Sequence, residues 1–267
     1  MTDGLALVTG ASSGIGAEFA RELAERGHPV LAVARRRDRL EALSNEAASW
    51  GGRIEPLVAD LASERGLALV TRRIEELGDL ELLVNNAGTV NAGDFIGTSS
   101  DRLSGEIRVN VDAVVGLTRT ALQGMVPRRR GAIINMASVV GFQPFPHFAV
   151  YAATKAFVLS FSEALAEELE GTGVRVLALC PGSVATEMDV FAHNEGLLGR
   201  LPSLTAKHVV KTGLNALDNG RVVKIVGSFN QLLPFMGRFM PRLALRKLMG
   251  MSVKSSQEKS GVRTGSF

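Results

Sequence analysis

Cysteine, tyrosine and aromatic residues in general are scarce in this chain of 267 residues. The single cysteine, Cys180, excludes a disulfide within the chain and fits a reducing compartment. Aromatic residues make up only 5% of the composition, and the basic residues are scattered although the formal net charge is +3. Bases would therefore find few aromatic rings to stack on, and no nucleic-acid partner is expected.

Long apolar runs are also missing from the sequence. No uninterrupted stretch reaches the length needed to span a bilayer, and the first residues, MTDGLALVTG, do not follow the pattern of a signal peptide. The four histidines, His28, His147, His193 and His208, show no metal-ligand spacing. We therefore expect a cytoplasmic protein without a metal site.

Short apolar segments alternate with amphipathic ones along most of the chain. The expected strands are rich in Val, Leu, Ile and Ala, as in parallel sheets buried on both faces, and span residues 5–9, 30–34, 54–59, 82–85, 132–137, 174–180 and 222–226. The expected helices span residues 14–26, 37–49, 62–77, 100–126, 149–171 and 205–219. Seven strands interleaved with six helices predict a Rossmann-like, doubly wound α/β fold with a seven-stranded parallel sheet flanked by helices.

We expect residues 1–228 to form one catalytic domain, because no linker rich in Pro, Gly or Ser divides them. Residues 229–251 form an apolar and basic extension, in which Pro234 and Pro241 prevent one continuous helix. Three roles fit the apolar side chains of this extension: packing on a partner subunit, covering a pocket, or contacting an anionic membrane surface through residues 230–251. Residues 252–267 are polar and are expected to form a flexible tail.

Small polar residues and glycines follow four of the expected strands. The first strand leads into TGASSGIG, in which Gly10, Gly14 and Gly16 permit a tight turn against a phosphate held at a helix N-terminus. The fourth strand is followed by NNAG, the fifth by Ser138, and the sixth by a Pro–Gly pair. Because ligands bind outside the carboxyl ends of the strands in such a sheet, these segments predict one shared binding crevice.

These motifs, in this order, resemble the short-chain dehydrogenase/reductase superfamily in its single-domain form. The set is T-G-x-x-x-G-x-G, N-N-A-G, Asn110, Ser138, Y-x-x-x-K and P-G, and it extends over roughly residues 5–226. Tyr151 and Lys155 form the Y-x-x-x-K motif, and Ser138 precedes the tyrosine by thirteen residues. The resemblance implies a nicotinamide-dependent oxidoreductase that assembles as a homodimer or homotetramer.

Tyr151, the only tyrosine in the chain, is the expected acid–base catalyst. On a helix, residues four apart share one face, so Tyr151 and Lys155 would both project into the crevice. A phenol has a pKa of about 10, and a nearby ammonium together with a cationic nicotinamide favours its ionised form. Ser138 is expected to hold the substrate oxygen, and the resemblance implies that Asn110 helps to hold a water between Lys155 and solvent.

Arginines rather than an acid follow the second expected strand, in the sequence AVARRRDRL. NAD enzymes of such folds carry an acid there to bind the ribose hydroxyls, whereas here Ala34 is followed by Arg35 and Arg36. A 2′-phosphate would meet guanidinium groups at this position and no carboxylate that repels it. Cations are disfavoured at a helix N-terminus, which also indicates a bound anion. The sequence therefore predicts NADP(H) as the cofactor.

The resemblance adds further cofactor contacts. Asp60 and Leu61 resemble the contact to adenine, and Thr186 resembles the contact to the nicotinamide amide. The complete expected set is Gly10, Ser12, Ser13, Gly14, Ile15, Gly16, Arg35, Arg36, Asp60, Leu61, Asn86, Ala87, Gly88, Tyr151, Lys155, Pro181, Gly182, Val184 and Thr186.

Apolar segments flank the expected acid–base pair. The sequence VVGFQPFPHFAV lies between Ser138 and Tyr151, and from it Gln143 and Phe145 join those two residues as expected substrate contacts. The segment after Gly182 would close over the pocket, and no arginine is placed to take a substrate carboxylate. We expect a hydrophobic ketone, aldehyde or alcohol as substrate. A non-catalytic NADP-binding regulatory protein and a lipid or 3-oxoacyl reductase at a membrane surface are the alternatives.

Overall fold

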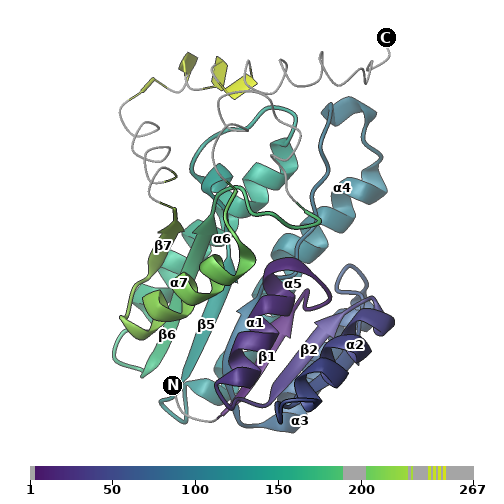
Figure 1. Cartoon of the computed structure of the whole chain (residues 1–267). Coiled ribbons are helices and arrows are strands. Elements are labelled where there is room, and N and C mark those ends of the chain that lie inside the picture. Colours follow the sequence, from purple (N-terminus) through teal and green to yellow (C-terminus); the bar gives the residue numbers. More distant parts are fainter. Residues whose placement is uncertain are drawn as a thin grey trace.

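A parallel sheet forms the centre of the molecule (Figure 1). The computed structural model describes residues 4–188, 203–227, 230, 240, 241, 243, 244, 246, 247, 249 and 250. Within this part, seven parallel strands have the order β3-β2-β1-β4-β5-β6-β7, as the sequence pattern predicts. The strands are β1 (Leu5–Thr9), β2 (Val30–Ala34), β3 (Ile54–Val58), β4 (Leu80–Asn85), β5 (Gly131–Met136), β6 (Val174–Pro181) and β7 (Val223–Val226).

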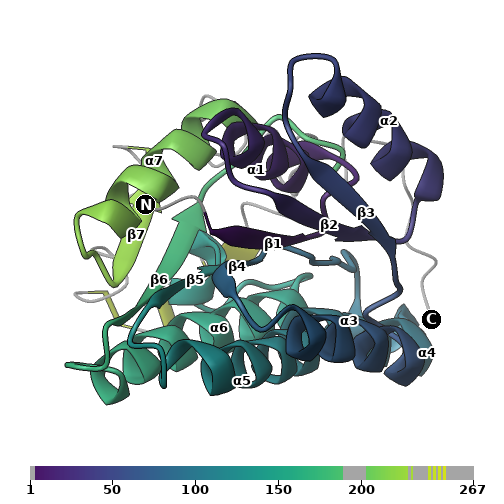
Figure 2. The ribbon, with the colours of Figure 1, turned by 90° about the horizontal axis from the view of Figure 1, so that it is seen from below.

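Helices cover both faces of the sheet (Figure 2). On one face lie α1 (Gly14–Glu25), α2 (Arg37–Ala48) and α7 (Ala206–Asp218), and on the other lie α3 (Glu64–Leu77), α4 (Ser100–Ile107), α5 (Ala113–Met125) and α6 (Ala149–Glu168). In β1, Ala6 and Val8 pack in the core under the first group, whereas Leu7 packs in the core under the second. Successive side chains point to opposite faces, so a strand covered on both faces must be apolar throughout.

The helix expected over residues 100–126 is interrupted in the structure. α4 ends at Ile107, a π-helical turn (Arg108–Asp112) follows, and α5 begins at Ala113. This turn carries Asn110, which hydrogen-bonds the loop after β4: its Oδ1 accepts from the Thr89 N–H at 2.9 Å, and its Nδ2 donates to the Thr89 carbonyl at 2.9 Å. Single π-turns inside helices often occur at functional sites, and these tertiary hydrogen bonds leave no mark in the apolar periodicity.

The other elements follow the expected bounds within a few residues. β4 begins at Leu80, two residues earlier than expected, and β6 continues to Pro181. Of the extension expected over residues 229–251, Met240 and Met249 pack in a cluster that includes Tyr151. Most other residues of that extension, and the tail at 252–267, lie outside the described residues. Among the described helices, none has the length and hydropathy needed to cross a membrane.

Candidate active site

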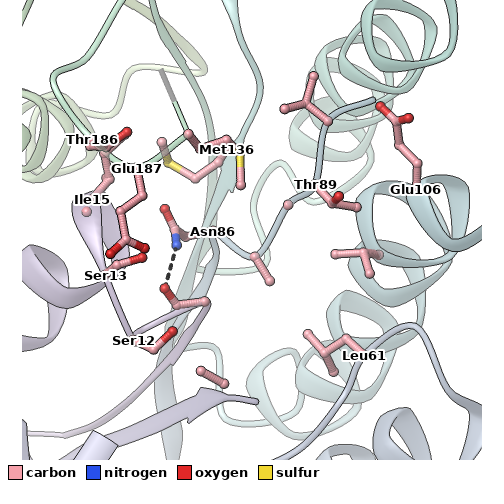
Figure 3. A pocket seen from close by; sticks show the side chains of 18 of the residues that line it. Ser12, Ser13, Ile15, Leu61, Asn86, Thr89, Glu106, Met136, Thr186 and Glu187 are labelled. Carbon is pink, nitrogen blue, oxygen red and sulfur yellow. Dashed lines mark hydrogen bonds between the residues drawn. The ribbon is translucent and has the colours of Figure 1, made fainter. Parts of the chain in front are cut away.

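A cavity of about 740 Å³ lies at the carboxyl ends of the strands. Segments that follow β1, β2, β3, β4, β5 and β6 all contribute to its wall. Figure 3 shows Ser12, Ser13 and Glu187 on one side of this cavity and Thr89 and Glu106 on the other. Parallel strands that end at one edge of a sheet bring these loops together, so the motifs that are dispersed in the sequence share one crevice.

Most of the expected cofactor contacts line this cavity. Those in its wall are Gly10, Ser12, Ser13, Gly14, Ile15, Arg35, Arg36, Asp60, Leu61, Asn86, Ala87, Gly88, Tyr151, Lys155, Pro181, Gly182, Val184 and Thr186. Gly16 lies outside the wall, in contact with the turn that Gly10 begins. A Cβ atom at Gly16 would come within 2.3 Å of the Gly10 carbonyl oxygen.

The glycine turn after β1 is held against the N-N-A-G segment. Gly10 has a φ of +68°, and a Cβ atom there would lie 2.8 Å from the Ala87 Cα. The Thr9 hydroxyl accepts hydrogen bonds from the N–H groups of Asn86 at 3.0 Å and Ala87 at 2.9 Å. Larger side chains at these glycines would fill the space between the two loops. The glycines therefore let the turn before α1 pack closely against the N-N-A-G segment.

The acid–base pair projects from the first turns of α6. Tyr151 and Lys155 are both buried, with 7% and 6% of their surface exposed, and both line the cavity. The Lys155 Nζ lies 5.7 Å from the centre of the Tyr151 ring and donates a hydrogen bond to the Met136 carbonyl at 2.7 Å. The four-residue spacing thus places both groups on one face, as expected.

Burial dominates the proton affinities of this pair. It raises the pKa of Tyr151 to about 12 and lowers the pKa of Lys155 to about 8. A hydrogen bond with Ser138 acts against burial and lowers the pKa of Tyr151, whereas the charge of Glu106 raises it further. The direction for Tyr151 is opposite to the one expected from the ammonium, because desolvation of the phenolate outweighs it.

Ser138 and Asn110 support the pair from neighbouring elements. The Ser138 Oγ also accepts a hydrogen bond from the Val140 N–H at 3.4 Å, directly after β5. Asn110 does not line the cavity; its Nδ2 donates to the Thr154 hydroxyl at 3.1 Å, and Thr154 is the neighbour of Lys155. Asn110 therefore links the π-helical turn to α6, the helix that carries Tyr151 and Lys155.

Two expected substrate contacts lie outside the cavity wall. Gln143 and Phe145 are buried, and Phe145 packs in the cluster of Tyr151 and Met249. The Gln143 Nε2 donates to the Met249 sulfur at 3.4 Å. In this structure they contact the C-terminal extension rather than open space, which the sequence between Ser138 and Tyr151 did not reveal.

Arg36 forms the centre of an anion site beside the glycine turn. Its guanidinium donates to the Ser12 hydroxyl at 3.0 and 3.1 Å and to the Ser13 hydroxyl at 2.7 Å. Its Nη1 contacts a carboxylate oxygen of Glu187 at 2.8 Å, and the same carboxylate lies 3.5 Å from Arg39. No carboxylate was expected beside the arginines from the sequence, but the loop after β6 supplies one. Two guanidinium groups on one carboxylate show that the residues present fit an anion such as a phosphate.

Replacing Glu187 by glutamine is expected to strengthen NADPH binding about two- to fivefold, because an exposed carboxylate that competes for Arg36 is removed. Fluorescence titration of the purified protein with NADPH measures this change. Glu41→Gln is the matched control. Glu41 is an exposed carboxylate on α2 that pairs with a different arginine, Arg37, at 3.4 Å. Weaker NADPH binding in the Glu187 variant would contradict the idea of competition.

Sequence reasoning missed a polar group at the α4 side of the cavity. Asn91, Arg102 and Glu106 all line the wall there. The Arg102 Nε donates to the Asn91 Oδ1 at 2.9 Å, and the Asn91 Nδ2 donates to Glu106 at 2.8 Å. The position of Glu106, four residues before Asn110, is the signal that could have revealed it, because that spacing places two side chains on one helix face.

A buried amide network was also missed, and it fixes the strands under the site. Asn85 donates to Asn135 at 2.9 Å and to Thr118 at 3.0 Å, and Asn135 donates to Ser162 at 3.0 Å. These bonds join β4 and β5 to α5 and α6.

The described part of the chain has no group of three His, Cys, Asp or Glu residues that could hold a metal ion.

Comparison with protein families identifies the class to which this site belongs. Residues 4–195 match the short chain dehydrogenase family, and the chain is a member of that family. The placement of Ser138, Tyr151 and Lys155 in one cavity is consistent with membership of this family.

Several curated proteins have related sequences. A short chain dehydrogenase of Pseudocercospora fijiensis is 40% identical over 68% of this chain and 60% of its own length. The 17-beta-hydroxysteroid dehydrogenase type 3 of Rattus norvegicus is 33% identical over 80% of this chain and 69% of its own length. A Homo sapiens protein named inactive hydroxysteroid dehydrogenase-like protein 1 is 34% identical over 78% and 64%. The matched regions thus span between 60% and 69% of these three relatives.

Solved structures match over nearly the whole chain. The bulky-bulky ketone specific alcohol dehydrogenase from Comamonas testosteroni has a TM-score of 0.75 and 28% identity, with coverage of 100% of this chain and 98% of that one. A short-chain dehydrogenase from Sphingobium yanoikuyae in complex with NADPH has a TM-score of 0.76 and 30% identity, with coverage of 99% and 98%. A 7beta-hydroxysteroid dehydrogenase has a TM-score of 0.81 and 26% identity, with coverage of 92% and 96%.

Proposed function

We propose that this protein is an NADP(H)-dependent oxidoreductase that reduces a hydrophobic ketone or aldehyde to an alcohol, or catalyses the reverse reaction. The observation that carries the proposal is that one cavity is lined by Tyr151, Lys155 and Ser138 together with Arg36 of the anion site. The acid–base chemistry and the cofactor site therefore share one wall.

Each side chain has a role that follows from its chemistry. The bound cofactor supplies the hydride to the carbonyl carbon, or accepts it from an alcohol. Ser138 donates a hydrogen bond to the substrate oxygen, and Tyr151 gives that oxygen its proton. Lys155 places a positive charge beside the phenol and the developing oxyanion. In the oxidative direction the Tyr151 phenolate removes the proton from the alcohol instead.

The choice of NADP(H) is supported by the segment after β2. Arg35 and Arg36 line the cavity where an NAD enzyme would place an acid, and Ser12 and Ser13 orient the Arg36 guanidinium. A planar guanidinium binds phosphate oxygens well. The related Sphingobium yanoikuyae enzyme was solved with NADPH, which is consistent with this choice.

A hydrophobic substrate is supported by the cavity wall and by the relatives. Val90, Met136, Val184 and Met188 contribute apolar surface to the wall. By their names, related proteins act on hydroxysteroids and bulky ketones.

The cluster of Met249 with Tyr151 supports the second of the three roles of the C-terminal extension, a cover over the pocket. A homodimer or homotetramer stays part of the proposal, with Phe157, 40% exposed and stacked on Phe161, offering an apolar surface.

The test is a comparison of NADPH and NADH consumption over a panel of carbonyl compounds. We expect the purified protein to turn over bulky apolar ketones and aldehydes with NADPH, and small polyhydroxy ketones poorly. Tyr151→Phe serves as the inactive control for background oxidation. Equal rates with NADH would overturn the cofactor assignment, and a preference for the polyhydroxy ketones would overturn the substrate class.

A non-catalytic NADP-binding regulatory protein is the second candidate, and one observation favours it: a relative with 34% identity is named inactive. The presence of Ser138, Tyr151 and Lys155 in one cavity, with Asn110 bonded to the neighbouring Thr154, argues for catalysis here. Tight NADPH binding without turnover of any carbonyl in the panel would support the regulatory role.

The third candidate is a lipid or 3-oxoacyl reductase at a membrane surface. Sedimentation of the protein with anionic lipid vesicles is the corresponding test.

A further inference from the structure

A buried carboxylate on α4 faces the same cavity as the acid–base pair. Glu106 has no exposed surface, yet it lines the cavity with Tyr151 and Lys155, and Figure 3 shows it beside Thr89. Its Oε2 accepts a hydrogen bond from the Asn91 Nδ2 at 2.8 Å. Its Oε1 is buried and has no hydrogen-bond partner within the described ranges. A carboxylate so placed is costly to bury, which points to a functional reason for it.

The charged groups around Glu106 come from two elements. Arg102 lies on its own helix, and Lys155 lies on α6, which packs against α4. The loop after β4 contributes the neutral Asn91 and Thr89. Burial raises the pKa of Glu106, while the hydrogen bonds of Asn91 and the charges of Lys155 and Arg102 oppose that shift. Its ionised form is thus supported mainly by groups of the active site itself.

Glu106 raises the pKa of both members of the acid–base pair. A negative charge disfavours a phenolate and favours an ammonium, so it raises the pKa of Tyr151 and also that of Lys155. In both residues the protonated form is the one that Glu106 stabilises.

We propose that Glu106 is a positioning residue of the acid–base centre, whose buried negative charge favours the protonated forms of Tyr151 and Lys155 and so shifts the pH range of catalysis. This inference rests on the proposed function. Reduction of a carbonyl needs a protonated phenol, whereas oxidation of an alcohol needs the phenolate. The carboxylate therefore favours the form competent for reduction near neutral pH, and it moves the onset of alcohol oxidation to higher pH.

The single tyrosine of the chain makes a direct test feasible. Phenolate absorbance reports on Tyr151 alone, because no other tyrosine is present. With a pKa of about 8, Lys155 is already neutral when Tyr151 titrates near 12, so this titration isolates the influence of Glu106. In Glu106→Gln we expect the midpoint of Tyr151 to fall by about one pH unit. The titration is run on the protein alone and with NADP⁺ bound, while circular dichroism follows folding over the same pH range.

Matched variants separate charge from structure. Asp101→Asn removes an exposed carboxylate from the same helix and is expected to leave the midpoint unchanged. Glu106→Asp retains the charge and should retain a midpoint close to that of the wild type. If Glu106→Gln does not fold, Glu106→Leu removes the same charge with a side chain of similar volume.

The second readout is the pH profile of kcat/KM for alcohol oxidation. Its rise with pH should move to lower pH by about one unit in Glu106→Gln and should return toward the wild-type position in Glu106→Asp. A folded charge-removing variant with an unchanged Tyr151 midpoint would overturn the inference, even if its activity were reduced. If the wild-type protein reduced no carbonyl, the proposed function would fail, while the absorbance titration would still measure the influence of Glu106 on Tyr151.

Discussion

Replacing Tyr151 by phenylalanine is expected to lower kcat for carbonyl reduction by roughly 100- to 10,000-fold, the usual contribution of a positioned general acid. The substitution removes only the phenolic oxygen, so the ring still fills its place in the cluster with Phe145, Phe148 and Met249. The hydroxyl that bonds Ser138 and gives its proton to the substrate is lost. Steady-state NADPH oxidation with the best ketone of the panel measures the effect.

NADPH binding is the control for this variant. The dissociation constant should change by no more than about threefold, because the substitution leaves the Arg36 guanidinium and its hydrogen bonds to Ser12 and Ser13 intact. Lys155→Ala, in contrast, should weaken both turnover and cofactor binding, since Lys155 is expected to contact both the phenol and the cofactor. A Tyr151→Phe variant that kept more than about a few per cent of wild-type kcat would show that another group donates the proton.

Replacing Arg36 by alanine is expected to raise the dissociation constant for NADPH about 10- to 100-fold and to change that for NADH little. A hydrogen bond to a charged group contributes about 1.5–3 kcal/mol, and each 1.4 kcal/mol corresponds to about tenfold in affinity. The hydroxyls of Ser12 and Ser13 hold this guanidinium beside the glycine turn, so it is already oriented for a phosphate. Isothermal titration with both cofactors gives the two constants.

Neighbouring arginines provide the comparison for this prediction. Arg35 also lines the cavity, and Arg35→Ala should raise the NADPH constant more than the NADH constant, though less than Arg36→Ala. Arg37 pairs with Glu41 and is not among the residues that line the cavity, so Arg37→Ala should leave both constants unchanged. Equal losses for NADPH and NADH in Arg36→Ala would mean that the guanidinium does not bind the 2′-phosphate.

The sequence by itself predicted the sheet and most of the residues that line the cavity. Short apolar runs such as Leu5–Thr9 are typical of strands covered on both faces, so the strands could be predicted from the sequence. The Y-x-x-x-K spacing and the glycines after β1 act through local geometry, and Gly10 and Tyr151 accordingly lie where they were expected. Motifs whose geometry depends on the spacing of a few neighbouring residues can be recognised from the sequence alone.

Only the tertiary structure decided which charges meet in that site. Glu187 reaches Arg36 across 151 positions of the sequence because the loops after β2 and β6 end at the same edge of the sheet. The burial of Glu106 depends on how α4 packs against α6, and the π-helical turn at Asn110 depends on its bonds to Thr89. Desolvation and Coulomb interactions depend on burial and distance, which no local pattern encodes. For that reason the direction of the pKa shift of Tyr151 emerged only once the chain was folded.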